Sequence, residues 1–297
     1  MKRRHYLRTS GLATGALLAG PSLLPGCSST ESMDRIGCTT VTFRKRFLLT
    51  NPDASGDILS LEKIPEFFQD RFGLYQCEFW SQHFESKDPA YLKGLKQALE
   101  NNHCTLINIQ VDTPGKDMSD PENSGLALEE LKEWIDVGAV LGARMIRGSF
   151  MNFSLEEGIK STRKLVDYAA AKGITFLSEN HFDLMSEPEK HIRVAQEVTH
   201  ENFGLLADFG NYPETTDKYE ALKMIAPHTR LVSAKTHAFD LNYEHTGFDF
   251  DRCVRIMEEG GFTGVYSVEQ WEDGLPDYDY ERIVDWMIRH VQANISI

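Results

Sequence analysis

The chain has 297 residues, with 31 Lys or Arg against 45 Asp or Glu, so its formal net charge at pH 7 is −14. This length suits one large α/β domain or two small ones. The acidic balance argues against a nucleic-acid partner, which would need a basic face, but it is compatible with a metal site built from carboxylates.

The first 27 residues resemble an export signal rather than part of a fold. Residues 2–8 are basic and contain paired arginines, as twin-arginine signals do, and residues 11–24 are apolar but too short to span a bilayer. The sequence LPGC at 24–27 resembles a lipobox, in which a peptidase cuts before a cysteine that then carries lipid. A chance cysteine after a signal peptide is the alternative.

These features predict an exported protein that loses residues 1–26 and is lipid-anchored through Cys27 at the periplasmic face of a membrane. This anchor is the only membrane contact that we expect. Residues 27–37 are small and polar and are interpreted as a short tether, and the domain is expected to span 38–297.

The other cysteines, Cys38, Cys77, Cys104 and Cys253, follow no zinc-site spacing. They are interpreted as small buried hydrophobic residues. An export compartment would allow a disulfide, and Cys77 with Cys104 is the one pair on neighbouring expected strands that merits a test.

From residue 38 onward, short apolar segments alternate with segments of helical periodicity. The expected strands are 38–44, 74–80, 104–112, 143–149, 174–179, 203–208, 229–237 and 262–269. The expected helices are 59–72, 89–99, 126–141, 154–172, 186–199, 219–225, 250–259 and 278–293. Gly73, Gly142 and Gly173 are expected to end helices. A Gly-, Asp-, Pro- and Ser-rich loop at 113–124 is long enough to be a candidate functional loop.

Eight strands alternating with eight helices over about 260 residues predict an α/β fold, a single closed (β/α)8 TIM barrel. The alternative is an open doubly wound sheet. That fold would favour a glycine-rich phosphate loop after the first strand, where the chain reads TFRKRFLL.

Acidic residues close three of the expected strands: Glu179, Asp208 and Glu269, with Glu78 just before the end of another. In a barrel these strand ends meet at one mouth, where ligands bind. Neighbouring carboxylates repel one another unless a cation lies between them, and a divalent metal is the simplest such cation. The alternative is that each acid caps the helix that follows it.

Four segments resemble the sugar phosphate isomerase/epimerase superfamily, whose barrels are xylose isomerase-like or AP endonuclease 2-like. They are SENH (178–181), DFGNYP (208–213), SAKTHAFD (233–240) and YSVEQW (266–271), with weaker similarity in CEFWSQHF (77–84), INIQVD (107–112) and LGARMIRG (141–148). The resemblance covers about residues 36–290. It implies a xylose isomerase-like fold and a metal held by acids on strands five, six and eight and a histidine on strand seven.

Glu179, Asp208 and Glu269 match three of these metal positions. Ser233 stands where the histidine is usual, so His237, on the same face of the strand, or a water would have to complete the site. The resemblance therefore implies a divalent metal, Mn, Mg, Co or Zn, on Glu179, Asp208, Glu269 and His237.

The resemblance also implies a metal-dependent isomerase or epimerase that moves a proton next to a carbonyl. Glu179 and Glu269 would serve as acid and base, and Lys235 would neutralise the developing charge or pair with an acid. The expected substrate-binding residues are His181, Asn211, Arg147 and Trp271; His83, Glu78 and Trp80 are weaker candidates.

Because sugar phosphates belong to the cytoplasm, export favours a free sugar or a glycoside as the small-molecule substrate. The same chemistry supports a lyase or hydrolase acting on a 3-keto-glycoside. A non-catalytic saccharide-binding barrel is the third interpretation, and Ser233 favours it. An endonuclease is disfavoured by acidity and export, and a homo-oligomer is left open.

Overall fold

The computed structural model describes residues 32–112, 121–148, 154–181, 184–272 and 278–295. The export signal, Cys27 and residues 113–120 of the expected functional loop lie outside the described residues. Within the described residues, no helix is both long and apolar enough to cross a membrane.

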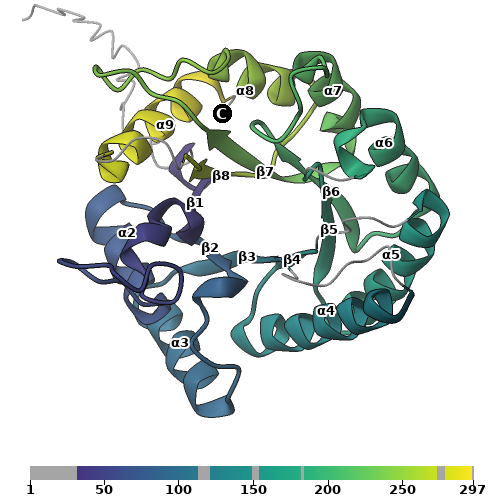
Figure 1. The fold of residues 1–297 in the computed structure, drawn as a ribbon, viewed down its shortest axis with the longest axis horizontal. Coiled ribbons are helices and arrows are strands. Elements are labelled where there is room, and N and C mark those ends of the chain that lie inside the picture. Colours follow the sequence, from purple (N-terminus) through teal and green to yellow (C-terminus); the bar gives the residue numbers. More distant parts are fainter. Residues whose placement is uncertain (1–31, 113–120, 149–153, 182–183, 273–277, 296–297) are drawn as a thin grey trace, which may run out of the picture.

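Eight parallel strands close into a barrel in chain order, and each pairs with the next. Figure 1 shows them as an inner ring surrounded by helices. The strands are β1 (Ile36–Thr39), β2 (Gln76–Trp80), β3 (Thr105–Val111), β4 (Met145–Gly148), β5 (Thr175–Glu179), β6 (Phe203–Asp208), β7 (Thr229–Thr236) and β8 (Val265–Gln270). This confirms the predicted single closed (β/α)8 TIM barrel.

Helices connect the strands and cover the outside of the barrel. The α-helices are α2 (Ile64–Phe72), α3 (Pro89–Asn101), α4 (Pro121–Leu141), α5 (Leu155–Ala170), α6 (Pro188–Glu197), α7 (Lys218–Ile225), α8 (Phe250–Glu259) and α9 (Tyr280–Asn294). Short 3-10 helices are η1 (Thr40–Arg46), η2 (Leu61–Lys63), η3 (Ser81–His83), η4 (Leu184–Ser186) and η5 (Ala226–His228).

The inward-facing side chains of the strands are apolar in the lower part of the barrel and polar at its mouth. Leu177, Leu206 and Leu231 are fully buried and form one apolar cluster with Ile107 inside the barrel. Two residues further along each strand, the inward positions are Glu179 on β5, Asp208 on β6 and Ser233 on β7, because side chains repeat with period two. The larger apolar cluster packs the helices against the barrel.

Three expected helix ends are confirmed by backbone geometry. Gly73, Gly142 and Gly173 adopt φ values of 68°, 75° and 73°, in the left-handed region that side chains with a Cβ rarely enter. Helices α2 and α4 end at the residue before their glycine, and α5 ends at Ala170, just before Gly173.

Several predicted boundaries are wrong. The first strand is Ile36–Thr39 rather than 38–44, because the Thr39 hydroxyl accepts a hydrogen bond from the Val41 amide at 3.3 Å and the chain turns into η1. The helix expected from 59 begins with η2 and becomes α-helical at Ile64.

Two helix starts also differ from the prediction. Helix α4 begins at Pro121 instead of 126. The helix expected from 186 begins at Pro188, because Ser186 lies in η4 and Glu187 is the residue before α6.

The cysteines that were considered for a disulfide, Cys77 and Cys104, are free thiols, as are Cys38 and Cys253. Cys38, Cys77 and Cys253 are buried, which agrees with their interpretation as small hydrophobic residues.

Candidate active site

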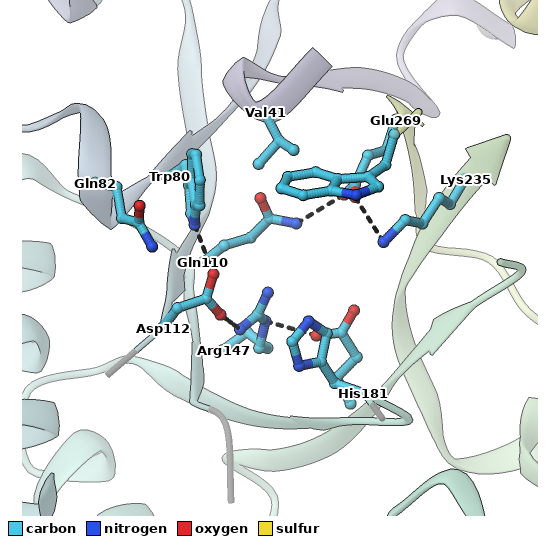
Figure 2. Close-up of a pocket in the computed structure, with 11 residues that line it drawn as sticks. Val41, Trp80, Gln82, Gln110, Asp112, Arg147, His181, Lys235 and Glu269 are labelled. Carbon is cyan, nitrogen blue, oxygen red and sulfur yellow. Dashed lines mark hydrogen bonds and ion pairs between the residues drawn. The ribbon is translucent and has the colours of Figure 1, made fainter. Parts of the chain in front are cut away.

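A cavity of about 380 Å³ opens at the carboxyl ends of the strands. Figure 2 shows its lining side chains converging from both sides of the barrel mouth. They are Val41, Trp80, Gln82, Gln110, Asp112, Arg147, Glu179, His181, Lys235, Glu269 and Trp271. The volume lies in the range of small-molecule sites.

On the β7–β8 side, a buried ammonium lies among oxygen atoms. Lys235 is 4% exposed, and its Nζ lies 3.1 Å from Glu269 Oε1, 3.0 Å from Asn211 Oδ1 and 3.7 Å from Asp208 Oδ2. Lys235 and Glu269 are neighbours in the parallel register of β7 and β8. Burial opposes the charge on Lys235, but the nearby carboxylates outweigh it and raise the pKa of the ammonium.

Glu269 is held ionised by its hydrogen-bond partners. Its Oε2 accepts from Gln110 Nε2 at 3.0 Å and from Ser233 Oγ at 3.3 Å. Burial alone would raise the pKa of Glu269, but Lys235, Gln110 and Arg147 together lower it. Gln110 is in turn oriented by the Thr39 hydroxyl, which donates to its Oε1 at 2.8 Å.

On the β3–β5 side, Arg147 is shared between two carboxylates. Its Nε lies 2.8 Å from Glu179 Oε2, and its Nη1 donates to Asp112 Oδ1. Asp112 also accepts a hydrogen bond from the Trp80 indole at 2.6 Å. Burial would raise the pKa of Asp112, but Arg147 and these hydrogen bonds lower it to about 2.

Glu179 behaves differently although it contacts the same guanidinium. Burial raises the pKa of Glu179 to about 7, against the opposing effect of Arg147 and Lys235. Its Oε1 accepts from Asn211 Nδ2 at 3.3 Å. The cavity thus has two carboxylates that stay ionised near neutral pH, Glu269 and Asp112, and one that titrates there, Glu179.

Asp208 and Asn211 are buried behind the cavity and do not line it. Asp208 Oδ1 accepts from the amides of Gly210 at 2.6 Å and Asn211 at 3.0 Å, which forms the turn after β6. Burial raises the pKa of Asp208 to about 7. Asn211 bridges Lys235 and Glu179, so it positions both residues without facing the cavity.

The remaining lining residues offer neutral contacts. Burial and the nearby Arg147 lower the pKa of His181 to about 4, so its imidazole is neutral at pH 7. The rings of Trp80 and Trp271 meet edge to face, with centroids 6.1 Å apart. The Arg44 guanidinium lies 4.1 Å from the Trp271 centroid, a cation–π contact that helps to hold this ring.

The expected metal set does not fit this geometry. Ser233 donates to Glu269, and both ring nitrogens of His237 face backbone carbonyls, Nδ1 that of Trp271 at 2.9 Å and Nε2 that of Gly210 at 3.1 Å. His237 therefore presents no nitrogen to the carboxylates. Among the described residues, no group of three or more His, Cys, Asp and Glu side chains is arranged to hold a metal ion.

Of the residues expected at the site, Glu179, Glu269, Lys235, Arg147, His181 and Trp271 line the cavity, whereas Asp208, Asn211 and His237 do not. Of the weaker candidates, Trp80 lines the cavity. Glu78 is buried and does not line it, and His83 stacks on Phe47 with centroids 3.7 Å apart.

Sequence reasoning missed Gln82, Gln110 and Asp112. A signal for two of them was present, because Asn108, Gln110 and Asp112 alternate with apolar residues at the end of an otherwise apolar strand.

The model of the family described as xylose isomerase-like TIM barrel matches residues 71–290. A comparison with curated proteins gives no match.

Solved structures share the architecture at low identity. A xylose isomerase-like TIM barrel protein from Mycobacterium smegmatis, solved in complex with magnesium, aligns with a TM-score of 0.64 and 16% identity over 90% of this chain and 99% of its own. An L-ribulose 3-epimerase aligns with a TM-score of 0.63 and 17% identity over 87% and 92%. The D-psicose 3-epimerase of Clostridium cellulolyticum H10, solved with D-tagatose, aligns with a TM-score of 0.61 and 15% identity over 88% and 96%. At these identities the similarity establishes the fold alone.

Proposed function

Because the chain belongs to the xylose isomerase-like TIM barrel family, we propose that it is a sugar isomerase or epimerase that moves a proton next to a carbonyl. One observation carries this proposal: Glu179 and Glu269 line the same cavity from different strands, and each lies beside a buried cation. Such a pair supplies a base, an acid and positive charge for an enolate.

In the proposed step, ionised Glu269 takes the proton from the carbon next to the carbonyl. The C–H bond breaks, its electron pair forms the enolate double bond, and the carbonyl electrons move to the oxygen. Lys235 and Arg147 donate hydrogen bonds that stabilise this negative oxygen. Protonated Glu179 then returns a proton to carbon.

The position of the returned proton decides the product. Return to the opposite face of the same carbon inverts it, which is epimerisation. Return to the former carbonyl carbon, with proton transfer between the two oxygens, is isomerisation. Both reactions use the same carboxylates and consume no external reagent.

A neutral sugar or glycoside suits the cavity better than a sugar phosphate. Both lysine and arginine of the cavity are already ion-paired with carboxylates. Gln82, Gln110 and neutral His181 can hydrogen-bond sugar hydroxyls, and Trp80 and Trp271 can pack against a ring face. The sequence expectation of an exported, lipid-anchored protein points the same way.

The same residues support a 3-keto-glycoside lyase as a second candidate. After Glu269 removes the proton next to the keto group, the bond to the β-linked oxygen breaks and protonated Glu179 donates its proton to that oxygen. The pKa of Glu179, raised by burial to about 7, favours this role as general acid.

The test is proton exchange in D₂O with a panel of free ketoses and 3-keto-glycosides. We expect deuterium at the carbon next to the carbonyl with at least one of them, and loss of this exchange in Glu179→Gln and Glu269→Gln. The exposed Glu100 on α3 provides a matched control, Glu100→Gln, which should exchange like wild type. If the protein binds a saccharide but no member of the panel exchanges deuterium, a non-catalytic saccharide-binding barrel would be favoured instead.

A further inference from the structure

We propose that the ammonium of Lys235 is the built-in cation that holds the substrate's carbonyl oxygen, in the place where the family resemblance implies a divalent metal. This role rests on the proposed proton-transfer function. Three observations support it: the contacts of the ammonium, the space beside the lysine side chain at Gly210, and the residue types at the expected metal positions.

The ammonium lies among groups that would otherwise bind a metal. Glu269 Oε1 is 3.1 Å and Asp208 Oδ2 3.7 Å from Nζ, and both acids match metal positions of the family pattern. Asn211 Oδ1 completes the set at 3.0 Å. A lysine that is almost fully buried requires such partners, because an isolated charge is strongly disfavoured there.

The chain leaves space for the stem of this lysine. A Cβ added at Gly210 would lie 3.0 Å from both Cγ and Cδ of Lys235 and 2.5 Å from Nε2 of His237. Glycine at 210 therefore lets Lys235 run past the turn after β6 and lets the His237 ring sit against the backbone. The same glycine thus admits the lysine to the site and keeps the histidine turned away from it.

The position where family members carry a histidine is occupied differently here. Ser233 is fully buried, and its hydroxyl donates to Glu269 Oε2 at 3.3 Å. This hydrogen bond stabilises the ionised form of Glu269, the carboxylate that pairs with Lys235. A hydroxyl is also a weaker ligand for Mn²⁺ or Zn²⁺ than an imidazole.

The cavity already holds two buried cations beside its carboxylates. Lys235 Nζ lies 3.1 Å from Glu269 Oε1, and Arg147 pairs with Glu179 and Asp112. A divalent ion beside Glu269 and Asp208 would lie close to the ammonium and be repelled by it. Lys235 itself lines the cavity, so it can reach a substrate oxygen.

The first test needs no variant. The protein is purified from cells supplied with Mn²⁺, its metal content is measured, and thermal unfolding is followed with added MnCl₂, MgCl₂, ZnCl₂ or EDTA. We expect far less than one metal ion per chain and an unchanged unfolding temperature under all four conditions. Close to one ion per chain, with an unfolding temperature lowered by EDTA, would overturn the proposal.

The second test asks whether removing the ammonium creates a metal site. The double variant Ser233→His/Lys235→Met places a histidine at the position of the family's metal ligand and removes the charge of Lys235. We expect it to bind Mn²⁺, seen by electron paramagnetic resonance and by a raised unfolding temperature, whereas Ser233→His alone stays metal-free because Lys235 remains. Metal binding by Ser233→His at the strength of the double variant would contradict the role of Lys235.

Activity distinguishes this inference from the proposed function. If wild type exchanges deuterium into a sugar, EDTA should leave the rate unchanged, and Lys235→Arg should retain more exchange than Lys235→Met. Exchange that requires added Mn²⁺ would overturn the inference and leave the proton-transfer function standing. If no sugar exchanges, the proposed function fails, and the metal content still decides what occupies the space between the carboxylates.

Discussion

The two sides of the cavity each hold a cation between carboxylates, yet their glutamates differ in protonation. On the β7–β8 side, Glu269 has Lys235, Gln110 and Ser233 as partners, and its pKa is lowered. On the β3–β5 side, Arg147 is shared between Asp112 and Glu179, and burial raises the pKa of Glu179 to about 7.

The difference shows that proximity to a cation does not by itself keep a buried carboxylate ionised. Asp112 accepts hydrogen bonds from both Arg147 and the Trp80 indole. Glu179 pairs with Arg147 and accepts a longer hydrogen bond from Asn211. Two titratable groups whose environments separate their pKa values form an acid–base pair. In the proposed reaction, Glu269 is therefore the base and Glu179 the acid.

The largest expected effect comes from removing either member of this pair. Glu269→Gln and Glu179→Gln should each lower kcat for sugar turnover by roughly 10²- to 10⁴-fold, because general acid–base catalysis contributes that much. Steady-state kinetics on the sugar found by the exchange screen measures this effect. Full activity in either variant would contradict this account, because it would show that the two glutamates do not take part in the same reaction.

Next in size is the stability effect of removing Lys235. Lys235→Met leaves Glu269 and Asp208 buried without their counter-charge and should lower the free energy of unfolding by about 3–5 kcal/mol. Lys223→Met is the matched control, because Lys223 pairs with Glu220 on the surface of α7 and should change stability by less than about 1 kcal/mol. Urea unfolding of both variants provides the measurement, and equal small losses would contradict a buried ion pair.

The pH profile of kcat/KM should reflect the same asymmetry. Activity requires ionised Glu269 and protonated Glu179, so it should rise through the low pKa of Glu269 and fall as pH increases through about 7, where Glu179 loses its proton. Well above that pH, the rate should drop about tenfold per pH unit. A rate that keeps rising to pH 9 would reverse the assignment of acid and base.

A smaller effect sharpens the comparison by changing one side only. The negative charge of Asp112 competes for Arg147 and thereby raises the pKa of Glu179. Asp112→Asn removes this charge. The variant should therefore have a lower pKa for Glu179, and the alkaline limb of its pH profile should move to lower pH. An alkaline limb that stays in place would show that Asp112 does not influence the acid.

The smallest expected effect concerns ring packing rather than protonation. Trp271→Leu should raise KM roughly 2- to 10-fold with little change in kcat, as expected for the loss of about 0.5–1.5 kcal/mol of aromatic contact. Steady-state kinetics separates the two constants. A kcat that falls as much as in Glu269→Gln would place Trp271 in the chemical step instead.

Much of the fold could be predicted because its signals are local. Alternating strand and helix periodicities predict the barrel, and glycines such as Gly73 and Gly173 mark helix ends through backbone conformation. The strand-end acids Glu179 and Glu269 follow from the same pattern, because parallel strands bring their carboxyl ends to one mouth. The first strand was mispredicted, since the turn after it depends on a single hydroxyl, that of Thr39.

The partners within the site could not be predicted, because they depend on contacts between distant segments. Periodicity places Ser233, Lys235 and His237 on one face of a strand, but it cannot show that Lys235 reaches Asp208 and Glu269. It also cannot show that His237 turns to the carbonyls of Gly210 and Trp271. Space at Gly210 decides both orientations, and that space exists only in the folded barrel.

The most direct test of the central assignment is a carboxyl-carbon NMR titration of the protein labelled with ¹³C-glutamate. The Glu179 and Glu269 signals are identified by their loss in Glu179→Gln and Glu269→Gln. We predict that Glu179 titrates near 7, while Glu269 remains ionised at every pH between about 5 and 8. Two signals that titrate together near the ordinary glutamate value would contradict the division of acid and base between the two sides of the cavity.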